Sequence, residues 1–267
     1  MTPDLLKKLK SKEIIIILGL FCVFFSFTKA NSEISTIDVE LFSKLEGSWL
    51  RKEYMQNVIQ SKSPIKAAAG LYNVEFQFSK NSGKYKFFTL LSFHEGSNFS
   101  INELKILPDK TGFQIGFDVI EKDQSFKSII IKTDNIANPK EISCFDGQNN
   151  VSFQKIIEKD TETIVNKIIL AGKYQDSKGL LFVFEENMIA KWPDKTFFYR
   201  INLDCVANIS DYIWLVDSSG KSINIFYAIE WNNGKLMVYN IDAETDMVTK
   251  QGSPILVLSR VDEQKSK

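Results

Sequence analysis

The stretch INIFYAIEWNNG, residues 223–234, decides the fold class of this chain. Apolar side chains occupy every second position from residue 223 to residue 231, which is the period of a strand with one buried face. Asn232-Asn233-Gly234 follows, and Asn-Gly favours a two-residue hairpin turn because both central residues need positive φ. The stretch therefore predicts a strand of an antiparallel sheet, with 234 inside its tightest hairpin.

The same alternation recurs in the stretches 72–78 and 113–119. Turn sequences rich in Asn, Asp, Ser and Gly separate such stretches, at 81–83, 109–112, 146–147 and 218–220. We therefore expect a mainly β protein of about fifteen short strands in an antiparallel meander. Edge protection favours closure into one or two barrels or stacking into sandwiches. Residues 172–241 should form a continuous meander without helix over 197–241.

One segment has helical periodicity. Leu50, Tyr54 and Val58 recur every four residues, which predicts a short helix directly after Trp49. Ser63-Pro64 marks its end, because the residue before proline is pushed out of the helical region. A second short helix is expected around residues 38–45.

A weak internal repeat divides the chain. The sequence LEGSW at 45–49 returns as LAGKY at 170–174, after the charged stretch 158–162. Each copy is followed by enough strand material for a small sheet or barrel. We therefore expect an N-terminal β domain over 31–162 and a C-terminal antiparallel β domain over 163–267.

The Leu-x-Gly-x-Trp start with a β meander behind it resembles the lipocalin superfamily and its calycin relatives. The resemblance implies that Gly47 and Trp49 begin a barrel, that Trp49 plugs one end, and that Arg260 in the last strand (255–261) packs over the indole by cation–π stacking. Gly172 and Tyr174 are the corresponding residues of the second half. The combination of Trp49, Lys52-x-Tyr54 and Lys62-Ser63-Pro64 with the second-half Gly-Lys-Tyr also resembles uncharacterised exported proteins of the Bacteroidetes. That resemblance would cover most of the mature chain, and it implies a compartment and an architecture but no activity.

The first thirty residues have the three-part layout of a secretory signal peptide. Four lysines between residues 7 and 12 precede the apolar run 14–27, and Thr28-Lys29-Ala30 offers small residues for cleavage before residue 31. Lipidation at Cys22 and an uncleaved anchor are the alternatives. We expect an exported protein, periplasmic or secreted, with no transmembrane segment in the mature chain.

The charge balance excludes some partners. The chain has 33 basic and 33 acidic residues, and residues 1–30 hold five Lys and two acids, which leaves 28 basic against 31 acidic. Without a basic excess or a recognition motif, no nucleic-acid partner is expected. Cys144 and Cys205 remain after cleavage, and in an oxidising compartment they could form a disulfide or stay as two buried thiols.

Catalytic and metal-binding motifs are not recognisable. His94 is the one histidine, at the end of a predicted strand, and neither a Gly-x-Ser-x-Gly elbow nor a zinc-ligand spacing accompanies it. The acidic pairs are typical of solvated turns. We therefore predict no enzyme activity, no cofactor and no metal site.

The predicted helix and the loop after it supply the candidate binding residues Tyr54, Lys62 and Lys66, beside the small residues 67–69. They could form a lid over a barrel mouth, with the lysines facing an anionic headgroup, or a cap that only excludes water. Two functions follow. The first is binding of a small apolar or amphipathic ligand inside a barrel. The second is a structural or interaction module with a filled core that binds another envelope protein.

Overall fold

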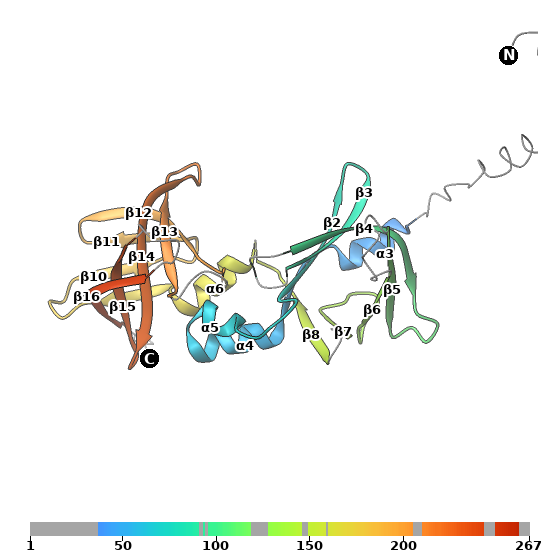
Figure 1. Ribbon diagram of the computed structural model, residues 1–267, viewed down its shortest axis with the longest axis horizontal. Coiled ribbons are helices and arrows are strands. Elements are labelled where there is room, and N and C mark those ends of the chain that lie inside the picture. The colour runs from blue at the N-terminus through green and yellow to red at the C-terminus, as the bar shows by residue number, and fades with distance from the viewer. Residues whose placement is uncertain are drawn as a thin grey trace, which may run out of the picture. The chain divides into compact units, whose positions relative to one another are not determined.

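The computed structural model describes residues 37–90, 93, 96–118, 128–145, 149–158, 160–204, 210–242 and 249–261. Within these ranges the chain folds into sixteen strands and four short helices (Figure 1). All neighbouring strands are antiparallel, and they form two closed barrels of eight strands each. The predicted mainly β meander is therefore confirmed, and two barrels replace the alternatives of one barrel or of sandwiches.

Barrel 1 takes the first eight strands in chain order, and β1 closes it by pairing with both β2 and β8. Its strands are β1 (Gly47–Arg51), β2 (Glu75–Asn81), β3 (Lys84–Leu90), β4 (Gly96–Ile106), β5 (Gly112–Phe117), β6 (Ser128–Lys132), β7 (Glu141–Phe145) and β8 (Asn150–Lys155).

Barrel 2 repeats this plan, because β9 pairs with both β10 and β16. Its strands are β9 (Gly172–Gln175), β10 (Leu181–Phe184), β11 (Ile189–Trp192), β12 (Lys195–Ile201), β13 (Tyr212–Val216), β14 (Ser222–Asn232), β15 (Lys235–Asp242) and β16 (Thr249–Arg260). The continuous meander predicted over 172–241 is confirmed, and the described residues of 197–241 contain no helix.

The Asn-Gly hairpin forms as predicted. Asn232 pairs with Lys235, and the two residues between them have φ values of 48° and 74°. The turn between Trp192 and Lys195 is equally short, so these two hairpins of barrel 2 have turns of the same length. Both turns connect strands without any longer loop, so the register of each pair follows directly from the turn.

Two details of the alternation are wrong. Ile223 and Ile225 were expected on the buried face of β14, but they are 45% and 42% exposed. The pairing of β13 with β14 shifts between Trp214 and Val216, and Asn224 has φ 56°, so the pleat is interrupted there. Tyr72 is 68% exposed because β2 begins only at Glu75.

The helices precede or follow the first strand of each barrel. Helix α3 (Val39–Leu45), capped by the Asp38 carboxylate, and α4 (Lys52–Ser61) are the two predicted helices. After α4, Lys62 is left-handed and α5 (Pro64–Ala68) starts with Ser63 as its cap. Helix α6 (Thr161–Ile169), capped by Asp160, was not predicted.

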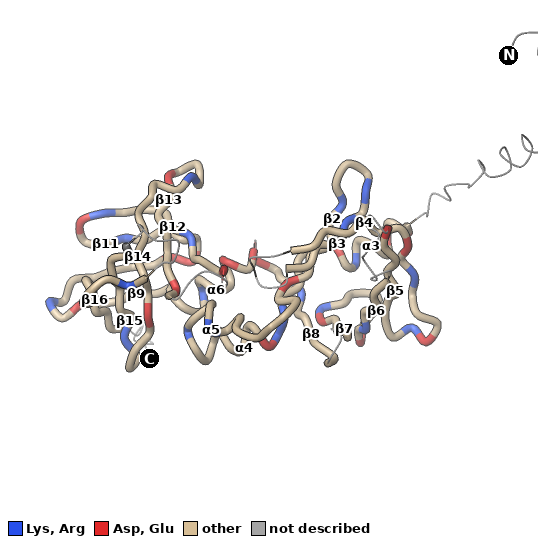
Figure 2. Tube along the Cα trace, in the orientation of Figure 1, with Lys and Arg blue, Asp and Glu red and all other residues tan. Residues whose placement is uncertain are grey.

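The predicted domain boundary at residue 162 falls inside α6, between the end of β8 and the start of β9. Ile37–Lys267 form one compact unit that contains both barrels. The predicted signal peptide, residues 1–30, lies outside the described residues. Basic and acidic residues are mixed along both barrels (Figure 2).

Each barrel has its own apolar core. The core of barrel 1 also takes Leu41, Phe42 and Leu45 from α3. The core of barrel 2 continues into α4, α5 and α6, through residues such as Tyr54, Val58 and Ile169. Figure 1 shows these three helices beside one another. The helix after Trp49 therefore belongs to the core of the second barrel rather than to that of the first.

Candidate functional site

Trp49 of β1 lies in the core of barrel 1, and its role as a plug of one barrel end stays a prediction. Trp49 is fully buried, and its indole N–H donates to the carbonyl oxygen of Leu45 at 2.8 Å, the last residue of α3. The Lys155 ammonium lies 5.3 Å from the indole centroid and donates to the Lys44 carbonyl at 3.0 Å. Partial burial lowers the pKa of the Lys155 amine.

The predicted contact between Arg260 and Trp49 is therefore wrong, because Lys155 is the cation that lies over the indole. The resemblance correctly expects a cation from the last strand of the barrel, but β8 closes barrel 1, and β8 supplies Lys155. Arg260 ends β16, and it pairs with Tyr174 in barrel 2. The error arose because the chain closes two barrels rather than one.

In barrel 2, Tyr174 and Arg260 make contacts that correspond to those of Trp49 and Lys155 in barrel 1. The Tyr174 hydroxyl donates to the Leu170 carbonyl at 2.7 Å, and burial raises the pKa of Tyr174 to about 12. Arg260 donates to the Ala171 carbonyl at 2.8 Å. A Cβ on Gly172 would lie 3.1 to 3.3 Å from three atoms of the Arg260 guanidinium, and φ of +154° would strain any other residue there, so a side chain would displace the guanidinium by a few tenths of an ångström.

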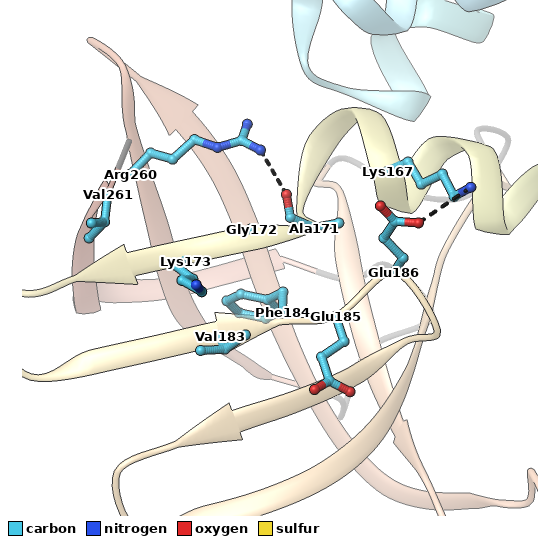
Figure 3. A pocket seen from close by; sticks show the side chains of 10 residues that line it. All are labelled: Lys167, Ala171, Gly172, Lys173, Val183, Phe184, Glu185, Glu186, Arg260 and Val261. Atoms are coloured by element: carbon cyan, nitrogen blue, oxygen red, sulfur yellow. Dashed lines mark hydrogen bonds and ion pairs between the residues drawn. The ribbon is translucent and has the colours of Figure 1, made fainter. Parts of the chain in front are cut away.

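A pocket of about 530 Å³ opens beside Gly172 and Arg260 (Figure 3). We call it the Arg260 pocket. It is lined by Arg260 and Val261 of the last strand and its end, by residues 171–173 at the start of β9, by residues 183–186 at the end of β10, and by Lys167 of α6. A volume of this size is within the range of small-molecule sites, which is about 300–1,000 Å³.

The carboxylates of the Arg260 pocket are already paired. Glu186 lies 3.4 Å from the Lys167 ammonium, and Glu185 forms an ion pair with Lys191. Arg260 differs from them. Its side chain is exposed, its partner is a backbone carbonyl, and no carboxylate of the described residues lies within ion-pair distance of it.

The predicted binding residues Tyr54, Lys62 and Lys66 do not form one site. Tyr54 is fully buried in the core of barrel 2, with its ring 5.1 Å from that of Phe93. The Lys62 ammonium donates to the Ile168 carbonyl at 3.2 Å, near the end of α6. Of the two readings, these contacts resemble a packed cap more than a lid.

Lys66 lines a smaller pocket of about 200 Å³ together with Asp211, Glu230 and Lys250. The Asp211 carboxylate accepts from the Ile65 backbone N–H at 3.0 Å, and burial raises its pKa. Glu230 accepts from the Lys250 ammonium at 2.6 Å, and this hydrogen bond lowers the pKa of Glu230. Asp211 thus anchors the start of α5 to barrel 2.

A second carboxylate makes the reciprocal link. Glu75 of β2 accepts from the Thr161 hydroxyl at 2.6 Å, at the start of α6, and burial raises the pKa of Glu75. Barrel 1 therefore offers a carboxylate to α6, as barrel 2 does to α5.

The predictions for the two cysteines and the histidine concern residues that are only partly described by the structure. Cys144 is buried in the core of barrel 1. Cys205 and His94 lie outside the described residues, so the disulfide and the role of the histidine remain predictions. Within the described ranges, no group of three His, Cys, Asp or Glu side chains is placed to hold a metal ion.

Sequence reasoning missed Lys155 and the whole of α6. A signal for α6 was present, because the spacing from Leu45 to Leu170 also relates Gly47 to Gly172 and Trp49 to Tyr174. Extending that comparison backwards would have placed a helix before the second copy, as one precedes the first.

Comparisons with protein-family models, with curated proteins and with solved structures find no match to this chain. Over the residues that the structure describes, none of the helices has both the length and the apolar character needed to cross a membrane.

Proposed function

We propose that this chain is an exported, non-enzymatic binding module of the cell envelope that acts through the outer surface of two filled barrels. The observation that carries this proposal is the aromatic filling of barrel 1. Phe76 stacks on Phe153 with ring centroids 4.2 Å apart, and Phe87 stacks on Phe117 at 5.4 Å. These side chains occupy the space in which a barrel of this size would hold a ligand.

Barrel 2 supports the same proposal. Trp192, where β11 ends, packs on Phe197 at 5.0 Å and on Tyr227 at 5.4 Å. The Lys195 ammonium lies 4.7 Å from the Trp192 ring centroid and donates to the Tyr227 hydroxyl at 3.1 Å. These contacts add to the stability of the aromatic cluster.

The other parts of the proposal rest on the sequence. The signal-peptide layout of residues 1–30 supports export, and the lack of a catalytic motif supports a non-enzymatic role. The Gly-x-Trp start and the closed eight-stranded barrels support a lipocalin-like relationship. A carrier of apolar ligands is the competing function.

Native mass spectrometry of the protein purified from the cells that make it separates the two functions. We expect the mass of the polypeptide alone, under conditions that preserve bound lipids. A stoichiometric apolar adduct would contradict the proposal and favour a carrier. Phe87→Ala is the matched positive control, because removal of a fully buried ring leaves a cavity that can bind benzene.

Crosslinking in intact cells tests the interaction itself. An amine-reactive reagent should join the protein to one or a few discrete partner proteins through its surface lysines. A monomer that forms no heteromeric product would contradict a protein-interaction role.

A further inference from the structure

We propose that the Arg260 pocket binds a carboxylate that carries a small apolar group. This deepens the proposed function, because it assigns a ligand chemistry to one place on the outer surface of barrel 2. The first support is Arg260 itself. A guanidinium has five N–H donors in a planar fork, and the Ala171 carbonyl takes one from Nη2. The remaining donors are available to a carboxylate, whose two oxygens match the fork.

The local charge is the second support. Each carboxylate at the pocket has a lysine partner, since Lys167 faces both Glu186 and Glu158 and Lys191 faces Glu185. Arg260 and Lys173 add two more cations to the lining. Among the described residues that line the pocket, three are cations (Lys167, Lys173 and Arg260) and two are carboxylates (Glu185 and Glu186).

The pocket also has an apolar part and a defined geometry. Val183 and Val261 lie among the charged groups, so a ligand with a short aliphatic group would bury apolar surface as its carboxylate reaches Arg260. Figure 3 shows Lys173 and Val183 between Arg260 on one side and the two glutamates on the other. Gly172 keeps the guanidinium close to the backbone of β9.

A groove of similar volume on barrel 1 lacks these properties. It holds about 550 Å³ and is lined by Lys110 and Lys132 together with Asp109, Asp134 and Glu141. Here the carboxylates outnumber the cations, so the groove does not favour an anion. The two pockets are therefore similar in size and differ in which charged residues line them.

The test compares N-acetyl-leucine with N-acetyl-leucinamide by isothermal titration calorimetry on the full mature protein. The two probes differ only in the charge of the terminal group. We expect the acid to bind about tenfold more tightly than the amide, as for loss of a charge-assisted contact. Equal affinities for acid and amide would overturn the proposal.

Arg260→Gln should weaken binding of the acid about tenfold and leave binding of the amide unchanged. Lys178→Gln is the matched control, because Lys178 lies in the β9–β10 turn of the same barrel and outside the pocket. Unchanged acid binding in a folded Arg260→Gln variant would refute the assignment. If circular dichroism shows that this variant does not fold, Arg260→Lys replaces it, and an affinity equal to that of the wild type would refute the paired contact.

The wild-type protein supplies a readout that needs no variant. Raising sodium chloride from about 0.02 M to about 0.5 M should weaken acid binding several-fold because the contact is partly exposed and screened. Binding of the acid that does not depend on salt would contradict this contact.

A peptide that ends in leucine with a free carboxylate identifies the source of the ligand. Tighter binding than N-acetyl-leucine indicates a protein C-terminus, and weaker binding indicates a free acid; both results support a carboxylate site.

The outcomes also separate this inference from the proposed function. If the acid does not bind and native mass spectrometry shows no apolar adduct, the ligand assignment is refuted and the proposed function as a filled-barrel binding module still holds. If an apolar adduct is found and Arg260→Gln does not affect it, the proposed function is refuted instead.

Discussion

In each barrel an aromatic side chain of the first strand donates a hydrogen bond to a carbonyl just before that strand, but the surrounding contacts differ. In barrel 1 the helix before the first strand packs by apolar side chains, and one indole N–H bonds to its last carbonyl. In barrel 2 the core contains Tyr174, Tyr199 and Trp231, whose polar atoms all bond to α6, at Leu170, Asn166 and Ile169. The comparison teaches that these polar aromatic side chains find their partners on the adjacent helix and the residue after it, whereas the buried Nε1 of Trp192 in the same barrel has no hydrogen-bond partner among the described residues.

The Phe-rich core of barrel 1 is the place where the largest effect is expected. Phe87→Ala should lower the free energy of unfolding by about 3–5 kcal/mol, because a buried ring is lost and a cavity remains. Urea denaturation measures this change in the free energy of unfolding. Phe145→Ala, at a side chain that is 61% exposed, is the control and should change stability by less than about 0.5 kcal/mol. A loss below about 1 kcal/mol for Phe87→Ala would mean that the core is not closely packed.

Asn166 tests the polar side of the comparison. Its amide donates to the carbonyls of Glu185 and Glu186 at 2.9 and 3.1 Å and accepts from the Tyr199 hydroxyl at 2.6 Å. Asn166→Ala should cost about 2–4 kcal/mol, because it leaves several buried groups without partners. Tyr199→Phe removes one of these bonds and should cost less, about 1–2 kcal/mol. Equal costs would show that the two backbone bonds contribute little.

The same position in α3 sharpens this contrast. Leu41 stands four residues before Leu45, as Asn166 stands four before Leu170, and it is buried. A polar residue there would lack partners, and this explains why the two helices differ although they hold the same place in the repeat.

Loss of the donor group of Tyr174 or Trp49 should have a smaller effect on the free energy of unfolding. Tyr174→Phe deletes only the hydroxyl that bonds to Leu170 and should cost about 1 kcal/mol. Trp49→Phe should cost more, because it removes ring volume as well as the N–H donor. Thermal unfolding compares both with Tyr72→Phe, at an exposed ring that should be neutral. A neutral Tyr174→Phe would show that this hydrogen bond does not stabilise the barrel.

The smallest expected effect is a pH dependence from the two linking carboxylates. Burial raises the folded-state pKa of Asp211 and of Glu75, so the folded protein binds these protons more tightly than the unfolded chain. Their contribution to stability is present below the unfolded pKa values of 3.8 and 4.5 and is lost as the pH rises through the folded values. Lys66 opposes the shift of Asp211, and Glu230 adds to it.

Asp211→Asn keeps an oxygen acceptor for the Ile65 N–H and removes the charge, so it should flatten the stability curve of the wild type above pH 3.8. Glu75→Gln should do the same for the link between β2 and α6. Denaturant titrations across mildly acidic pH measure this. A wild-type stability that rises relative to Asp211→Asn over that window would contradict the raised pKa.

Local pattern predicted much of this fold. The alternation along β5 and β14, the Asn232–Gly234 turn and the four-residue spacing in α4 are each encoded by neighbouring residues, and all four elements form. Contacts between distant strands could not be predicted in that way. Which strand supplies the cation over Trp49 depends on which strand closes the barrel, and no residue near Lys155 or Arg260 encodes this.

The candidate site shows the same limit. Helical spacing placed Tyr54 on a buried face, but it could not say that the core of the second barrel covers that face. The Arg260 pocket joins residues of α6, β9, β10 and β16, which only barrel closure brings together. Arg260 ends β16 and pairs with Tyr174 in barrel 2, and local sequence did not show that Arg260 and Trp49 belong to different barrels.

The measurement that tests the central claim most directly is a crystal structure of the protein under xenon pressure. Xenon enters apolar cavities large enough to hold it, so it reports whether either barrel has internal space. We expect no xenon inside the barrels of the wild type and one bound atom beside Phe117 in Phe87→Ala. Well-occupied xenon inside a wild-type barrel would contradict the filled cores and favour a ligand carrier.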